Sequence, residues 1–194
     1  GILLFDLMDK KVWGKAVLDT LGLKQYYNLT KDKYKWGERL EASVYTCLNQ
    51  EVADRVLLLM NNRTKSSVLS SEEIALVTSG KGELFLTDED IVRIVNLDNP
   101  LNVQLNNGKF SIGDNLFLDQ AERTVGLTAL QKDDGVVIFA EIKDVLPAQL
   151  KTLKEAKGEV TSNYQDYLEA LWIKELQEKY PVYINQKAFD SLIQ

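Results

Sequence analysis

The sequence of 194 residues contains no histidine and only one cysteine, Cys47. Without histidine, imidazole is excluded as an acid, a base, a nucleophile and a metal ligand. One cysteine cannot form a disulfide within the chain. Because Cys47 lies in the apolar alternation from Val44 to Leu48 and has no imidazole to activate it, we expect a small core residue there and not a nucleophile.

Long apolar runs and an excess of positive charge are also lacking. No segment approaches the roughly 18 consecutive apolar residues of a membrane span, so we expect no span. The 29 acidic residues outnumber the 23 basic ones and give a net charge of -6. Since a nucleic-acid binder carries a strong basic excess, we expect no nucleic-acid partner. The remaining composition, 45% hydrophobic and 27% charged, is that of an ordinary globular protein.

The start of the sequence lacks the basic, apolar and small-residue pattern of a signal peptide. Gly1 is followed directly by Ile2-Leu3-Leu4-Phe5, which indicates that the given sequence starts inside a helix. We therefore expect a part of a longer protein, whose targeting signal would lie upstream.

Helical periodicity dominates the first 34 residues. Apolar residues at spacings of three, four and five predict a helix over 2–20, with an inward face of Leu4, Phe5, Met8, Val12, Val17 and Leu18. After Gly22, a second helix is expected from Leu23 to about Tyr34.

Residues 150–180 predict one long helix, in which Gly158 would mark a bend. Its expected apolar face consists of Val160, Tyr164, Tyr167, Leu168, Leu171, Trp172 and Leu176. Short helical turns are expected over 186–193. Because neither end of the chain can cover its own apolar face, we expect the N-terminal helices and the long helix to pack on each other.

Capping residues mark helix starts between these ends. Asn49 precedes a helix expected over 51–62, and Ser70 or Ser71 caps a short one. The run Thr87-Asp88-Glu89-Asp90 opens a short helix or strand over 91–95. This run could also hold a hard cation, but it lacks EF-hand spacing, and acidic residues at a helix N-terminus are the preferred interpretation.

Two runs predict strands. Apolar and polar residues alternate over 40–47, which is typical of a strand with one buried face, and 136–142 is the most strand-like run in the sequence and is expected to be central. Asp133-Asp134-Gly135 predicts a tight turn before the second run.

Asn106-Asn107-Gly108 predicts a similar turn between 101–105 and 109–118. Three carboxylates near that segment, Asp114, Asp119 and Glu122, could suggest glycoside chemistry, but solvated loop charges are the preferred interpretation.

Three passages together resemble the parvulin-type peptidyl-prolyl isomerases of the SurA and PpiD kind. Gly22-Leu23-Lys24-Gln25-Tyr26-Tyr27 is similar to the helix before a parvulin domain, and Glu38–Val44 to its first strand. Val137–Ala148 resembles the last parvulin strand with its proline-containing exit. The later segment Trp172–Leu176 is similar to the C-terminal helix of relatives with several parvulin segments.

The catalytic groups implied by this resemblance are missing. The family's first-strand histidine falls near Ser43, and its last-strand histidine near Phe139 or Ala140. The glycine-rich passage with its buried aromatic is replaced by Leu101–Asp119. We therefore assign no catalytic residue, no metal ligand and no cofactor.

The expected fold is α+β: a degenerate parvulin-like α/β domain with an antiparallel sheet, inserted between N-terminal helices and a long C-terminal helix. The expected segments are 1–38, 39–147 and 148–194. The resemblance implies a non-catalytic chaperone fragment of a periplasmic foldase, whose clients are unfolded exported or outer-membrane proteins. A structural or homodimerisation domain and an active isomerase with a rewired site remain alternatives.

An aromatic set supplies the candidate client-binding residues. They are Tyr26, Tyr27, Trp36, Tyr164, Tyr167 and Trp172. One interpretation is that these rings seal the packing between the terminal helices. The other is that some of them form a groove for extended chains, because amphipathic rings offer apolar area and a polar group together.

Overall fold

A computed structural model describes residues 2–77, 84–182, 185–186 and 190. The chain forms two compact units. The helical unit comprises Gly1–Lys35 with Leu150–Gln194, and the sheet unit comprises Trp36–Gln149. The short strands β1 (Lys35–Trp36) and β7 (Gln149–Leu150) pair where the chain passes between the units. Most of the predicted turns over 186–193 lie outside the described residues.

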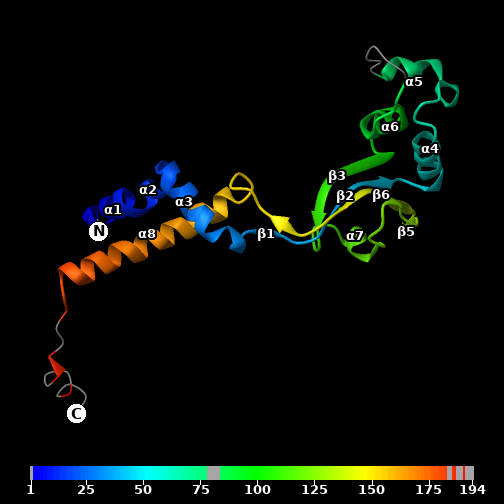
Figure 1. Cartoon of the computed structure of the whole chain (residues 1–194). Helices are drawn as coiled ribbons and strands as arrows, with labels where there is room; N and C mark the ends of the chain where they lie inside the picture. Colours follow the sequence, from blue (N-terminus) through cyan, green and yellow to red (C-terminus); the bar gives the residue numbers. More distant parts are fainter. Residues whose placement is uncertain (1, 78–83, 183–184, 187–189, 191–194) are drawn as a thin grey trace. The chain divides into compact units, whose positions relative to one another are not determined.

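The helical unit consists of N-terminal helices alongside one long helix (Figure 1). Its elements are α1 (Ile2–Met8), the π-helix η1 (Asp9–Trp13), α2 (Gly14–Leu18), α3 (Thr20–Thr30), the 3-10 turn η2 (Lys31–Lys33) and α8 (Lys157–Lys179).

The predicted packing of the two ends on each other is confirmed. The buried residues of this seam are Val12, Ala16, Leu23, Tyr34, Ala156, Val160, Tyr164 and Leu168. The predicted inward face of the first helix is wrong in part, because Leu4, Phe5, Val17 and Leu18 are exposed. The wide turn of η1 shifts the helical phase, so Val12 and Ala16 take the buried positions.

The long helix is shorter than predicted. Residues 151–156 form turns, α8 begins at Lys157, and Gly158 therefore lies in its first turn and marks no bend. Only a single row at intervals of four, Val160, Tyr164 and Leu168, is buried. The rest of the predicted apolar face is at least partly exposed.

The sheet unit contains an antiparallel sheet of order β3-β2-β6-β4, with β5 also paired to β6. The strands are β2 (Arg39–Cys47), β3 (Val103–Ser111), β4 (Gly126–Leu127), β5 (Gln131–Asp133) and β6 (Val136–Leu146). The helices are α4 (Gln50–Asn61), η3 (Ser66–Val68), α5 (Ser71–Leu76), α6 (Asp88–Val95) and α7 (Leu116–Gln120). The antiparallel sheet and the long C-terminal helix confirm the predicted α+β class.

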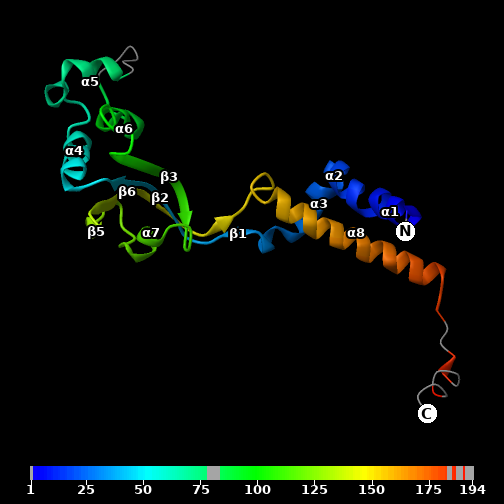
Figure 2. The same cartoon turned by 180° about the vertical axis from the view of Figure 1, so that it is seen from behind.

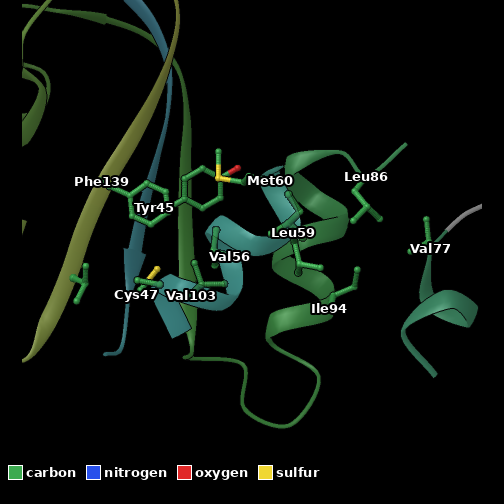
Figure 3. Packing of buried hydrophobic residues seen from close by; sticks show 13 residues of the cluster. Tyr45, Cys47, Val56, Leu59, Met60, Val77, Leu86, Ile94, Val103 and Phe139 are labelled. Atoms are coloured by element: carbon green, nitrogen blue, oxygen red, sulfur yellow. The ribbon is translucent and has the colours of Figure 1, made fainter. Parts of the chain in front are cut away.

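Helices cover both faces of this sheet. On one face, Tyr45 and Phe139 stack and pack toward Val56 and Leu59 of α4 (Figure 3). On the other face, a second cluster includes Leu118 of α7, and Figure 2 shows α7 and α6 on opposite sides of the strands. The predicted alternation of β2 is therefore wrong: the strand is buried on both faces.

The predicted cap Asn49 is confirmed, and of the two candidates Ser70 and Ser71 the structure has Ser70 as the cap. Residues 91–95 are helical, and Thr87 caps their helix. The turn at Asp134 and Gly135 is confirmed, with positive φ at both residues. The predicted turn at 106–108 is wrong, because these residues lie within the continuous strand β3. None of the described helices combines the length and apolarity needed to cross a bilayer.

Candidate functional site

Three of the predicted binding residues form one aromatic cluster in the helical unit. The ring centroid of Tyr26, on α3, lies 5.4 Å from that of Tyr164 and 5.2 Å from that of Tyr167. The rings of Tyr164 and Tyr167 stack at 6.1 Å along α8. The cluster therefore joins α3 to α8 through ring contacts.

Tyr164 is the buried member of this cluster, and Tyr167 is its most exposed member. The Tyr164 hydroxyl donates to the Asp19 carboxylate at 3.1 Å, and Asp19 accepts from the backbone N–H of Gly22 at the start of α3. Burial, helped by the Asp19 carboxylate, raises the pKa of Tyr164 to about 12. Tyr164 is 5% exposed and Tyr167 is 45% exposed. Only Tyr167 therefore offers a large accessible ring surface.

Tyr27 and Trp172 belong to the same buried seam. Tyr27 stacks on Tyr34 at 6.2 Å, and its hydroxyl donates to the Lys151 carbonyl at 2.7 Å. Trp172 is partly buried against the residues of the seam. These contacts fix the helices and leave only parts of the rings accessible.

Trp36 differs from the other predicted residues because it belongs to the sheet unit. The guanidinium carbon of Arg39 lies 4.3 Å from its ring centroid, which is a cation–π contact. The ring is therefore engaged on one face by a neighbour only three positions away.

Sequence reasoning missed a broader apolar surface on the helical unit. Large apolar side chains stand exposed on three of its helices: Leu3, Leu4, Phe5, Leu7, Val17, Leu18, Tyr167, Leu171, Ile173 and Leu176. The apolar periodicity was visible in the sequence, but it was assigned to the buried seam. We refer to these exposed side chains collectively as the exposed helical surface.

In the sheet unit, the positions where the resemblance implies histidines are buried structural positions. Ser43 on β2 is fully buried and donates a 2.6 Å hydrogen bond to Asp88. Phe139 stacks on Tyr45 with centroids 5.2 Å apart, and Ala140 belongs to the core on the other face. These side chains supply no acid or base.

Asp88, buried in the first turn of α6, is the centre of a partly exposed ionic network. It accepts from Lys143 at 2.6 Å and from Arg63 at 2.7 Å, and Arg63 also bonds Glu141 at 2.9 Å. Burial alone would raise the pKa of Asp88, but the hydrogen bonds from Lys143, Ser43 and Arg63 outweigh it and hold the pKa well below its usual range.

A cleft of about 380 Å³ opens beside this network. It is lined by Arg63, Phe85, Thr87, Asp88, Glu89, Asn107, Glu141 and Lys143. Arg63, Lys143, Asp88 and Glu141 are paired with one another, and Glu89 accepts from the Asn107 side-chain amide at 3.1 Å. The cleft is therefore polar, and its lining carries three carboxylates against two cations. Cys47 lies in the core, where burial raises the pKa of its thiol to about 12.

The carboxylates considered above for cation binding or glycoside chemistry stabilise local structure instead. Asp90 closes the capping box of Thr87, Asp114 accepts from the backbone N–H of Ser111, and Asp119 accepts from that of Gly113. Within the described ranges, no three cysteine, aspartate or glutamate side chains gather as metal ligands.

No protein-family model and no curated protein sequence matches the chain. A solved structure similar to it comes from Campylobacter jejuni, in work describing the virulence factor PEB4 and the periplasmic protein Cj1289 as two structurally related SurA-like chaperones. The alignment covers 95% of this chain and 71% of that one, with 14% sequence identity and a TM-score of 0.35. At this level of similarity, function must be argued from the chain's own residues.

Proposed function

We propose that this chain is a polypeptide-binding, chaperone-like module of a periplasmic folding factor. It holds exposed apolar segments of unfolded exported or outer-membrane proteins and acts without catalysis. The observation that carries the proposal is the exposed helical surface. The compartment and the class of client follow from the motif resemblance to SurA and PpiD.

The exposed helical surface has the chemistry that unfolded chains require. Large apolar side chains that remain in water offer interaction sites, because burying each one fully is worth about 1.5–3 kcal/mol before ordering costs. Leu4, Leu18 and Leu171 are all more than 40% exposed. A few such contacts at a time give binding in the micromolar range, about -8 kcal/mol, which is weak enough for release without a nucleotide.

The tyrosine cluster adds a polar component to this surface. Tyr167 is accessible and is backed by Tyr26 and the buried Tyr164. A ring held in place by neighbouring rings loses little side-chain entropy on binding, and its hydroxyl remains available for hydrogen bonds. Such a group suits clients of varied sequence.

The test is suppression of aggregation. The full chain is added in several-fold molar excess to a protein diluted from denaturant, and light scattering is followed. We expect a clear delay that is reduced by the triple variant Leu4→Ser, Leu18→Ser and Leu171→Ser. The matched control, Ile112→Ser with Leu116→Ser and Val125→Ser, removes equally exposed apolar residues from the sheet unit and should leave the delay intact. The absence of any delay by the unaltered chain contradicts the proposal.

A second candidate, homodimerisation, is favoured by the same exposed leucines. Two copies of an apolar helical surface can cover each other as well as a client can. Light scattering over a range of concentrations separates the two functions: a dimer at every concentration that binds no client favours a structural role. Turnover of a proline peptide well above buffer would instead indicate a rewired isomerase.

A further inference from the structure

The free edge of β3 carries a regular row of backbone groups. β3 is the first strand of the sheet, and among the described strands it pairs with β2 alone. The N–H of Leu48 bonds the carbonyl of Asn102, which faces it in the continued register, so the even-numbered residues of β3 form the ladder with β2. The odd-numbered residues therefore direct their N–H and C=O groups away from the sheet.

Both ends of this edge are closed by side chains. At Val103 the Asn96 amide satisfies both backbone groups, accepting from the N–H at 2.9 Å and donating to the carbonyl at 2.9 Å. At Ser111 the N–H donates to the Asp114 carboxylate at 2.7 Å. These bonds independently confirm that the odd-numbered backbone groups point outward, and they define where the open part begins and ends.

Between these caps, the outward N–H and C=O groups of Leu105, Asn107 and Lys109 have no partner among the described residues. We propose that this segment of β3 binds an extended polypeptide, which adds to the sheet as a further strand. The spacing of these groups indicates a strand as the partner. Three donor–acceptor pairs that repeat every second residue match the edge of another β-strand and no small ligand.

The register also fixes what a side chain of the bound strand meets. Residues directly opposite each other in paired strands share a face of the sheet. The residue opposite Asn107 would therefore point to the face that holds the cleft of Arg63, Phe85 and Glu89. The residue opposite Leu105 would lie over the core side of the sheet, where Leu105 itself packs.

The class of partner rests on the proposed polypeptide-binding function, but the site is separate. It lies in the sheet unit and would bind the backbone N–H and C=O groups of its partner. The exposed helical surface would instead bind apolar side chains. Serine substitutions on the helices should therefore leave the β3 site intact. A chain that fails in the aggregation test and still binds a strand at β3 would overturn the first proposal and support the second.

Amide hydrogen exchange resolved by NMR tests the β3 site in the full chain. The probe is a nine-residue peptide of alternating valine and lysine. On saturation with this peptide, exchange of the Leu105, Asn107 and Lys109 amides should slow at least tenfold. The same peptide N-methylated at consecutive residues, which cannot form the ladder, should give no protection. Equal protection by both peptides, no binding, or protection that rises with protein concentration without peptide would overturn the proposal.

A pair of variants tests the same backbone group independently. Asn107→Pro removes an outward N–H without removing a bond to β2, and we expect peptide affinity to fall at least fivefold. Asn107→Ala loses the same side-chain bond to Glu89 but keeps the N–H, and should change affinity less than twofold. Circular dichroism checks that both variants fold, and equal affinities in two folded variants would contradict strand addition.

Discussion

The Ser43 hydroxyl donates a 2.6 Å hydrogen bond to the carboxylate of Asp88, 45 positions away in the sequence. This bond ties β2 to the first turn of α6. Ser43 stands near the position where the parvulin resemblance implies a histidine, and here its hydroxyl connects two structural elements. The adjacent strand positions, Asn107 and Glu141, line the same polar cleft.

Replacing Ser43 with alanine should destabilise the sheet unit. The substitution leaves the buried Asp88 carboxylate with one donor fewer, and we expect a loss of about 1.5–3 kcal/mol in the free energy of unfolding. Urea denaturation measures it. Ser66→Ala, at an exposed serine, is the control and should change stability by less than about 0.5 kcal/mol. Equal stability of the two variants would show that the Ser43–Asp88 hydrogen bond does not stabilise the sheet unit.

Stability should fall in acid because of Asp88. Its pKa is held below its usual range in the folded chain, so its contribution is complete above the unfolded pKa of about 3.9 and is lost as pH falls through the folded value. Between pH 5 and pH 2 the loss should be on the order of 2 kcal/mol. Asp88→Asn should flatten this dependence, whereas Glu122→Gln, at an exposed loop carboxylate, should not. Parallel pH curves for all three proteins would refute the assignment.

Gly22 and Gly158 should respond to alanine with opposite signs. A Cβ at Gly22 would collide with the Tyr164 hydroxyl and the Asp19 carboxylate, whereas one at Gly158 meets nothing. Gly22→Ala should therefore destabilise the helical unit by about 2 kcal/mol, and Gly158→Ala should stabilise it by about 0.5 kcal/mol. Thermal unfolding followed by far-ultraviolet circular dichroism measures both, and a shift of the same sign in the two variants would count against the packing described.

Cys47 should be inert in the folded chain. It is fully buried, and its thiol pKa is raised to about 12 by that burial. Alkylation by iodoacetamide at pH 8, followed by mass spectrometry, should proceed at least about 100-fold more slowly than in denaturant. Rapid labelling under native conditions would mean that the sheet opens readily.

Local signals in the sequence predicted elements where one short segment decides the conformation. The hairpin at Asp134 and Gly135 needs positive φ at two consecutive residues, which that pair tolerates. The same reasoning failed at Asn107 and Gly108, because continuous pairing with β2 outweighs the local turn preference. Such pairing depends on a strand more than 50 positions away, and no local pattern reports it.

The candidate site was predicted only in part for a similar reason. The sequence identified Tyr26 and Tyr167, because rings at helical spacing are visible in it. It did not separate the buried seam from the exposed helical surface, since the π-turn over Asp9–Trp13 changes which apolar residues face inward. The open edge of β3 leaves no compositional signal, because its partners are backbone atoms.

Binding of unfolded polypeptide to the exposed helical surface is the activity proposed for this chain. Its most direct test is the affinity of a fluorescently labelled, permanently unfolded protein for the full chain, measured by anisotropy. We predict a dissociation constant in the micromolar range, raised at least about tenfold by the combined Leu4→Ser, Leu18→Ser and Leu171→Ser substitutions. An affinity unchanged by those substitutions, in a variant that folds normally, would contradict the claim.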